Sequence, residues 1–528
     1  MTTVPMITSP RWLQRIATPV MILGLSGCAS VPADLGRSEV DELVAERGQA
    51  IDTGETSAIL SNLVTQALTA DDAVRIALIN NPELQATYAE LGFAAADVYE
   101  AGRIRNPILS GLVLSSNRSG ELDQVSFGLV TSFTDFVTLP ARKRLAAAEY
   151  AAVKQHIGAV VLETAAEAES AYYQFVGAKQ VAALRSQIAK AAGLSAALAE
   201  RYHEAGNMTP RELAMERAAA AEARLEALAA DAEAYAMRSA LGTVMGLSVS
   251  GSWDAPAQLP VPLASEDSLD ELLSLAARSR LDLAAARADA DRVADQRGVT
   301  GWTRWLGDLD VGFENERETD GARLKGPSVD WEVPLFTQNR DALLRLDADL
   351  QIAIAEVRRL TLAVNNDVHL AFAKAANARA HVKTYRDTLV PARVAVTARA
   401  KEEEAFMLIG IFELLEIKQQ EYDAYQGYLE AVRDYWLART ELTRAVGNSL
   451  PSSGNIGKER LDVEELIQPQ GGGEHSQHNM QGDMKGMQHD MQGDMKGMQH
   501  DDAKPAETAP PESEYAGHGN HKPDGESQ

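Results

Sequence analysis

The chain has 528 residues, and its 76 acidic residues outnumber its 50 lysines and arginines, which gives a formal net charge of −26. Nucleic-acid binding needs basic residues in excess to neutralise phosphates, so this charge argues against nucleic acid as a partner. Aromatic residues make up only 5% of the chain while alanine is abundant, a composition that favours long, closely packed helices over a core of bulky side chains.

The N-terminus has the pattern of an export signal. Two arginines precede an apolar run over residues 16–25, which is too short to span a bilayer stably. The run ends in Leu25-Ser26-Gly27-Cys28, which resembles the lipobox of bacterial lipoproteins, and Cys28 is the only cysteine in the sequence. We predict a signal peptide over 1–27 and lipid attachment at Cys28. Because Ala29 rather than Asp follows, we expect the outer membrane. The alternative is an ordinary signal peptide with an incidental cysteine.

The middle of the chain repeats itself weakly at an offset of roughly 200 residues, which suggests two copies of one structural unit. In each copy, a helical pattern precedes two short strand-like segments joined by a polar loop with glycine, as a β-hairpin requires. The segments begin near Pro107, Gln124, Leu306 and Ser328. We expect an extension over 28–67, a first repeat with linker over 68–268, a second repeat over 269–448, and a C-terminal tail over 449–528.

The second strand pair carries a regular alternation of apolar and acidic residues. A period of two places all apolar side chains on one face and all acids on the other. This pattern fits either a soluble sheet with its acids in solvent or an outer-membrane barrel with an acidic, water-filled lumen. In the second case, the lumen acids are Asp308, Asp310, Glu314, Asp330 and Glu332.

Long helical runs follow each strand pair and favour the membrane interpretation. The runs over 141–205 and 339–406 contain one proline, Pro391, and the first corresponds to about 100 Å of helix. Each run ends in a sharp turn, and a shorter helix returns over 211–246 and 411–447. Helices of this length suit a tube that crosses a compartment rather than a globular domain.

These features together resemble the TolC-like outer-membrane efflux protein family over residues 68–448. The resemblance rests on the order of three motifs: Leu68-Thr69-x-x-x-Ala73-x-x-x-Ala77-Leu78-x-x-Asn81-Pro82-x-Leu84, residues 101–107 before the first strand, and Val333-Pro334-Leu335-Phe336 before the second long helix. The first half departs from the pattern at residues 133–140, where Pro140 introduces the long helix.

The resemblance implies a mainly α fold with β-hairpins. It implies a homotrimeric tunnel in which four strands per protomer form a 12-stranded β-barrel, continued by a long periplasmic α-helical barrel. It also implies a passive channel without catalytic residues or a required cofactor. Its partners would be outer-membrane lipid, a periplasmic adaptor protein and an inner-membrane pump.

Two glutamates follow the second helix turn. Glu413 and Glu416 are three residues apart and therefore share one helix face. The resemblance implies a paired acid here that lines the periplasmic aperture, where threefold symmetry brings six carboxylates to one axis. Such a ring favours cations. The alternative is that both side chains lie in solvent on the outside of the helix.

The two turns themselves are the surfaces that an adaptor would contact. Four consecutive apolar residues at a helix end form a patch that is typical of a partner site, although packing against the neighbouring protomer's turn explains them equally well. The predicted contact residues are Gly206, Asn207, Met208, Thr209, Phe406, Met407, Leu408, Ile409 and Gly410.

The C-terminal tail contains an eleven-residue unit twice without a mismatch, over 480–490 and 491–501. Its composition, without a periodic apolar face, predicts disorder. Thioether sulfur is a soft donor that selects ions such as Cu(I) and Ag(I), and histidine adds affinity for Cu(II) and Zn. The alternative is a repeat that arose by replication slippage and has no ligand role. The predicted metal ligands are Met480, Met484, Met487, His489, Met491, Met495, Met498 and His500.

Three functions are consistent with these patterns. The first is an outer-membrane channel of a tripartite efflux system that exports copper, silver or other heavy-metal cations. The second is a drug or peptide channel whose tail buffers metal. The third is a coiled-coil spacer lipoprotein that holds metal on its tail, although a spacer has no need for hairpins with an apolar face.

Overall fold

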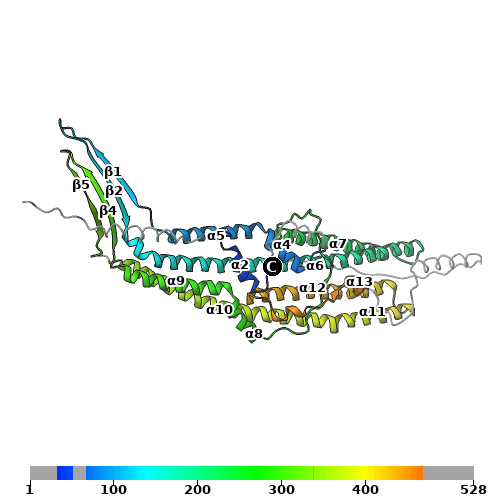
Figure 1. Cartoon of the computed structure of the whole chain (residues 1–528). Coiled ribbons are helices and arrows are strands. Elements are labelled where there is room, and N and C mark those ends of the chain that lie inside the picture. Colours follow the sequence, from blue (N-terminus) through cyan, green and yellow to red (C-terminus); the bar gives the residue numbers. More distant parts are fainter. Residues whose placement is uncertain (1–32, 51–66, 337, 468–528) are drawn as a thin grey trace, which may run out of the picture. The chain divides into compact units, whose positions relative to one another are not determined.

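The computed structural model describes residues 33–50, 67–336 and 338–467, which form helices and one main sheet (Figure 1). In chain order the helices and strands are α2 (Arg37–Ala45), α4 (Ala70–Asn80), α5 (Pro82–Ala101), β1 (Ile108–Leu114), β2 (Gln124–Ser132), α6 (Phe133–Glu204), α7 (Pro210–Val244), β3 (Leu259–Pro260), α8 (Leu269–Ser279), α9 (Leu281–Thr303), β4 (Asp308–Arg317), β5 (Arg323–Glu332), α10 (Arg340–Thr384), the π-helix η1 (Tyr385–Leu389), α11 (Val390–Ala405), α12 (Ile411–Val446), the 3-10 helix η2 (Pro451–Asn455), β6 (Arg460–Leu461) and α13 (Val463–Ile467).

The two halves of the chain use the same order of elements. In each half, two helices separated by one extended residue precede a hairpin, then a long helix and a returning helix. Thr69 and Asp72 form a capping box at the start of α4, and Asn81 caps α5 by accepting a hydrogen bond from the Leu84 amide. Ser268 caps α8 in the second half. The break between α8 and α9 lies at Arg280, whose backbone is extended. Capping side chains thus set the helix starts.

The long helices are confirmed. Helix α6 has 72 residues, which corresponds to about 108 Å, and it begins at Phe133, before Pro140. Our expectation that Pro140 introduces this helix is wrong. The hydroxyl of Thr134 donates to the Gly307 carbonyl at 3.1 Å and accepts from the Leu309 amide at 2.9 Å. These contacts stabilise the first turn of α6, before Pro140. In the second half, the π-helix η1 and then Pro391 interrupt the corresponding run.

The main sheet has the strand order β1-β2-β4-β5, and every pair is antiparallel. Strand β5 begins at Arg323, five residues before the Ser328 that the sequence suggested. Residues 323–327 pair in register with 317–313 of β4, where Pro327, which has no amide hydrogen to donate, lies opposite Phe313. No helix in the described ranges is both long and apolar enough to cross a membrane.

An aromatic core joins α6 and α12. The rings of Tyr173 and Trp436 stack with centroids 5.4 Å apart, and Tyr435 packs edge-on against Trp436 at 5.2 Å. The Arg433 side chain of α12 packs directly on Gly177 of α6, where an added Cβ would lie 2.6 Å from it. This core fixes the two halves of the chain against each other.

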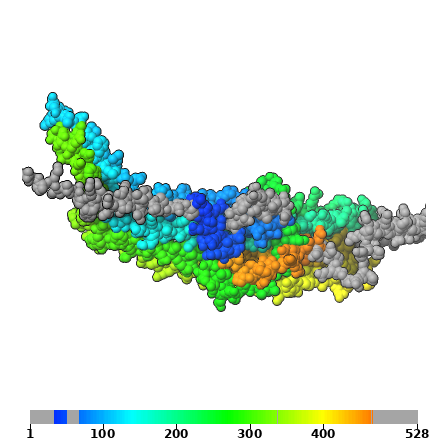
Figure 2. All heavy atoms as spheres, in the orientation of Figure 1, coloured from blue at the N-terminus to red at the C-terminus, as the bar shows by residue number. Residues whose placement is uncertain are grey.

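Helix α2 lies across the neighbouring helices, as the dark blue segment of Figure 2 shows. The Tyr88 hydroxyl donates to Asp41 at 2.9 Å, and the Tyr150 hydroxyl donates to the Leu35 carbonyl at 2.8 Å. Lys154 pairs with Glu39. The residues that follow α2 continue this contact, because the Ser449 amide donates to the Arg47 carbonyl at 3.0 Å. No pattern in the sequence indicates a helix in this extension.

Our expectation that a disordered tail begins at residue 449 is wrong for residues 449–467. This segment contains η2, β6 and α13, and β6 pairs with β3.

Candidate functional site

The strand acids lie on one face of the sheet. In the β4–β5 register, Asp308 lies opposite Glu332 and Asp310 lies opposite Asp330, so four carboxylates form two like-charged pairs. Glu314 lies opposite Gly326 on β5 and Gly128 on β2. None of the five carboxylates has a hydrogen bond or ion pair with another residue in the described ranges. Like charges that face each other across two strands destabilise a sheet.

The opposite face of the same sheet is apolar and uncovered. Its side chains come from all four strands, and large ones are exposed: Leu109 is 76% exposed, Val329 65% and Trp331 55%. The register places Leu129 of β2 opposite both Leu109 and Phe313, which makes the apolar surface continuous from β1 to β4. A soluble sheet buries such a face, so the two interpretations of the alternation are no longer equal, and contact with lipid is favoured.

Both edges of this sheet are open. In the described part of the chain, β1 pairs only with β2 and β5 pairs only with β4. Unpaired backbone groups are too costly to leave exposed in a bilayer core. The sheet is therefore incomplete in one chain and needs other strands beside β1 and β5.

The two helix turns have the same backbone geometry. After α6, the Asn207 amide donates to the Tyr202 carbonyl at 2.9 Å and Gly206 has a φ of +78°. After α11, the Leu408 amide donates to the Glu403 carbonyl at 2.9 Å and Met407 has a φ of +59°. Both are Schellman turns with a left-handed residue at the same position. Glycine adopts this conformation without cost, whereas a methionine there costs roughly 1–2 kcal/mol.

The turns lie against each other. The rings of Tyr202 and Phe412 meet edge-on at 6.4 Å, and Met208 is buried in a small cluster with Phe412 packed against it. Met208 therefore forms the core beneath its own turn. Gly206, Asn207, Thr209 and Gly410 are exposed and Ile409 is partly exposed. The large exposed apolar side chains of the second turn are Phe406 at 77%, Met407 at 92% and Leu408 at 73%.

Glu413 and Glu416 are exposed in the first turns of α12. Their face of the helix continues through Gln420, which accepts a hydrogen bond from Arg393 of α11 at 2.6 Å, and Asp423, which lies 3.7 Å from Arg185 of α6. Neither Glu413 nor Glu416 has a side-chain partner among the described residues. Their position is thus a free acidic surface beside the turn.

A buried acid anchors α12 below these glutamates, which the sequence did not indicate. Glu421 accepts hydrogen bonds from Lys418 at 2.6 Å and from the Tyr425 hydroxyl at 3.0 Å. Burial by itself raises the pKa of Glu421, but the hydrogen bonds from Lys418 and Thr397 outweigh burial and lower it. Glu421 is therefore a charged structural residue that fixes the start of α12 against α11.

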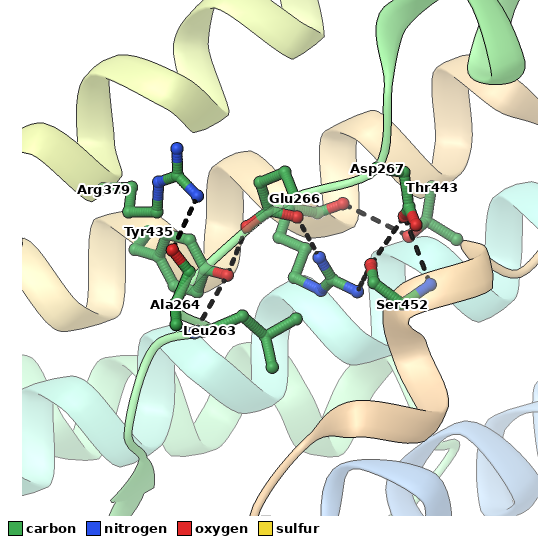
Figure 3. Close-up of polar contacts among 9 residues, drawn as sticks. Leu263, Ala264, Glu266, Asp267, Arg379, Tyr435, Thr443 and Ser452 are labelled. Atoms are coloured by element: carbon green, nitrogen blue, oxygen red, sulfur yellow. Dashed lines mark hydrogen bonds and ion pairs between the residues drawn. The ribbon is translucent and has the colours of Figure 1, made fainter.

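A second buried polar cluster lies at the junction between the two halves (Figure 3). Arg439 pairs with Glu266, both almost fully buried, and donates to the Ser452 hydroxyl at 2.8 Å. Ser452 in turn donates to Asp267 at 2.6 Å. Since removing one partner of a buried ion pair leaves the other charge unpaired, this cluster holds the linker before α8 against α12. Its members are too distant in sequence for a pattern to indicate them.

Near this cluster, Glu169 of α6 has a raised pKa. Burial raises the pKa of Glu169 to about 7, although hydrogen bonds with Tyr173 and Thr440 and the positive charge of Arg439 act in the opposite direction. The side chain faces the aromatic core rather than the strands or the turns. It is a structural acid that changes charge near neutral pH.

The remaining predicted site residues are outside the described residues. Cys28 and the eight Met and His ligands of the tail belong to this group. Within the ranges that the structure does describe, no group of three or more His, Cys, Asp or Glu side chains is arranged to hold a metal ion.

Comparison with known proteins finds relatives and solved structures that are similar to this chain. Residues 73–247 match the family described as outer membrane efflux protein. The cobalt-zinc-cadmium resistance protein CzcC of Cupriavidus metallidurans is 26% identical over 396 residues, which cover 72% of this chain and 90% of that relative. A membrane protein from Pseudomonas aeruginosa has the same fold, with a TM-score of 0.62 and 19% identity over 74% of this chain and 95% of its own. CusC gives a TM-score of 0.60 and 15% identity, covering 72% and 92%.

Proposed function

We propose that this chain belongs to the outer membrane efflux protein family, whose model it matches over residues 73–247, and that it is the outer-membrane conduit of a tripartite system that exports heavy-metal cations. Channels of this family are trimers that work with a periplasmic adaptor and an inner-membrane pump, and they are not enzymes. The observation that carries the cation proposal is the main sheet, which is apolar and uncovered on one face and acidic on the other.

Trimer formation explains the open sheet edges. Three copies place β5 of one protomer beside β1 of the next, so that four strands per copy close a 12-stranded barrel and leave no edge. Closure with the apolar face outward places Leu109, Val329 and Trp331 in lipid. The strand acids then line the lumen.

The acids inside such a barrel support a cationic cargo. Rings of carboxylates attract cations and repel anions, and Asp308, Asp310, Asp330 and Glu332 would contribute twelve carboxylates in three copies. Glu413 and Glu416 would add a second ring at the periplasmic aperture. The name of the relative CzcC points to divalent cobalt, zinc and cadmium, whereas the methionines of the tail suit Cu(I) and Ag(I).

The exposed turn is the proposed contact with the adaptor. Met407 occupies a left-handed backbone position at a cost that its repeat counterpart Gly206 avoids. Strained residues of this kind concentrate at functional sites. Phe406, Met407 and Leu408 present a compact apolar surface that an adaptor helix could cover.

The location of α2 is consistent with a lipid anchor at Cys28. Leu35 is held by Tyr150, which lies seventeen residues after the start of α6 at Phe133, or about 26 Å along the helix. Seven residues separate Leu35 from Cys28, and such a segment spans at most about 24 Å. A fully extended segment would therefore bring Cys28 to within about 2 Å of the level at which the strands begin. A mature protein whose Cys28 carries no lipid mass would refute this anchor.

Metal tolerance in cells tests the proposed cargo. A strain that lacks this gene would receive the wild type, a lumen variant (Asp308→Asn, Asp310→Asn, Asp330→Asn, Glu332→Gln), or a control variant that neutralises exposed acids of α5 (Glu90→Gln, Asp97→Asn, Glu100→Gln). We expect the lumen variant to lower tolerance to at least one of cobalt, zinc, cadmium, copper or silver salts at an unchanged trimer level. The control should match the wild type.

The other functions give different results in the same assay. A gene deletion that lowers tolerance to organic drugs but to no metal would support the drug channel. A lumen variant that restores wild-type tolerance to every metal would show that the strand acids have no role in export. Tolerance that depends on the tail alone, without any conductance, would support the spacer lipoprotein.

A further inference from the structure

Charged residues on β4 and β5 are completely sorted by sign between the two faces of the sheet. The acids Asp308, Asp310, Glu314, Glu316, Asp330 and Glu332 share one face, whereas the cations Arg317, Arg323 and Lys325 share the apolar face. Chance sorting of nine charges in this way is improbable, and solubility does not require it. Acids are explained by a cation pathway, but cations on the apolar face need another explanation.

The three cations gather at the hairpin end of the strands. Arg317 lies directly opposite Arg323, and Lys325 lies opposite Asn315. A directly opposed pair of like charges is unfavourable unless an anion lies between them. In a chain with a net charge of −26, carboxylates that could neutralise this pair are abundant, yet all six acids of these strands are on the other face.

Partners within the chain do not neutralise the cations. Arg317 is half-buried and donates through Nη2 to the Asp123 carbonyl at 3.2 Å, while its Nε has no hydrogen-bond partner. Arg323 and Lys325 are exposed, and neither forms an ion pair with another described residue. A neighbouring copy's edge strand β1, Ile108–Leu114, carries no charged residue that could pair with them.

The position of the cations along the strands matches the border of an apolar band. Trp331 lies at the helix end of β5, and Lys325 lies six residues further towards the hairpin, about 20 Å along the strand. A strand tilt of 35–45° reduces this distance to about 15 Å of height, and the apolar band of an outer-membrane barrel is about 25 Å tall. The exposed side chains of Val333 and Leu335 extend the apolar surface beyond Trp331 towards the helices. The helices lie at the opposite end of the strands, so the cations are at the far border of the band.

We propose that Arg317, Arg323 and Lys325 form a binding site for the phosphate groups of lipids in the outer leaflet of the outer membrane. This site rests on the proposed function, because only a barrel with its apolar face in lipid brings these side chains to the headgroups. Guanidinium groups bind phosphate with paired, charge-assisted hydrogen bonds. The exposed side chains of Arg323 and Lys325, beside Arg317, supply such donors.

Lipid retention by the purified trimer tests this site. Detergent-solubilised full-length trimers would be incubated with bis-phosphorylated lipid A, and native mass spectrometry would count the retained lipids. We expect the Arg323→Gln/Lys325→Gln variant, which leaves the Arg317 bond to the backbone intact, to bind lipid A about five-fold more weakly for each cation removed. The control Arg345→Gln/Arg358→Gln removes two exposed cations of α10 and should bind as the wild type does.

Three comparisons complete this test. Lipid A without phosphate should bind equally weakly to wild type and variant, and inorganic phosphate should not displace lipid A, because the proposed ligand is a headgroup at the membrane border. Equal retention of bis-phosphorylated lipid A by wild type and variant would overturn the site, as would displacement by millimolar phosphate. Conductance of the same trimers in planar bilayers separates this result from the proposed function, since a conducting trimer without lipid selectivity contradicts the lipid site alone.

Discussion

Asp310 of β4 and Asp330 of β5 lie directly opposite each other on the acidic face of the sheet. A directly opposed pair of like charges costs roughly 0.2–1 kcal/mol, and the pair has no cation beside it among the described residues. A sheet selected for stability alone would not contain this pair. We interpret the Asp310–Asp330 repulsion as a consequence of an acidic lumen that passes cations.

Neutralising this pair should stabilise the protein. The Asp310→Asn/Asp330→Asn variant should unfold at a higher temperature than the wild type, and the difference should shrink with added salt, which screens exposed charges. Glu314→Gln is the matched control, because Glu314 faces glycines on both neighbouring strands and its removal should change little. An equal shift in both variants would mean that the cross-strand repulsion is not the cause.

The aperture acids should control conductance. Replacing Glu413 and Glu416 by glutamine removes six carboxylates from the axis of a trimer. Because such a ring attracts cations, single-channel cation conductance should fall and block by multivalent cations should weaken. The control is Glu204→Gln/Glu403→Gln, which neutralises exposed acids near the turns. Unchanged conductance and block would place the gate elsewhere and leave Glu413 and Glu416 as solvated helix residues.

Met407 should lower the stability of the fold and strengthen binding of the adaptor. Met407→Gly removes the left-handed strain and should raise the free energy of unfolding by about 1 kcal/mol, because glycine adopts this conformation freely. The same change should weaken binding of the adaptor, measured with the purified partner, because it removes the most exposed apolar side chain of the turn.

Gly206→Ala is the counterpart in the first turn. Its Cβ would meet no neighbouring atom, so its effect comes from the positive φ alone, and it should lower stability. If Met407→Gly leaves adaptor affinity unchanged, this turn is not the contact surface.

The acidity of Glu169 predicts a pH dependence of stability. The pKa of Glu169 is about 7 in the folded chain, above the ordinary value of 4.5, because the side chain is buried. Between these two values, the folded state holds a proton that the unfolded state has lost. Stability therefore falls as the pH rises through this range, by up to roughly 3 kcal/mol from this group.

The Glu169→Gln variant should flatten this pH dependence. Its thermal midpoint should exceed that of the wild type at pH 8 and match it at pH 4.5. Glu167→Gln, an exposed acid of the same helix, should retain the wild-type profile. A wild-type midpoint that does not change between pH 5 and 8 would show that Glu169 does not titrate in this range.

The tail should matter for metal tolerance but not for assembly. Deleting residues 471–528 should leave trimers and conductance intact and should lower tolerance to copper or silver. A peptide over 475–500 should bind Cu(I) or Ag(I) through thioether sulfur, and only its histidine contribution should fade below about pH 6, as imidazole protonates. A coordination shell without sulfur in X-ray absorption, or a truncated strain as tolerant as its parent, would contradict this role.

Local patterns in the sequence predicted much of the fold. The scarcity of proline and glycine predicted the long helices, and the strict alternation of Asp308 to Glu314 with apolar residues predicted that the acids share a face, which the register confirms. The strand acids follow from a period of two, which needs no knowledge of distant contacts.

Features that depend on distant contacts could not be predicted. Helix α6 begins before Pro140 because Thr134 bonds to residues of the second half, and the pair of Glu266 and Arg439 joins residues that are far apart in the chain. The left-handed conformation of Met407 was not expected, since methionine rarely adopts it. The roles of the aperture, the turns and the tail are still predictions.

The reversal potential of the purified trimer tests the central claim most directly. Wild-type trimers in a planar bilayer, under a gradient of potassium chloride, should give a potential of the sign for cation preference. The lumen variant with Asp308, Asp310, Asp330 and Glu332 neutralised should shift it towards zero, while the α5 control should not. A wild-type channel that prefers anions, or a lumen variant with unchanged cation preference, would contradict the account of an acidic conduit for metal cations.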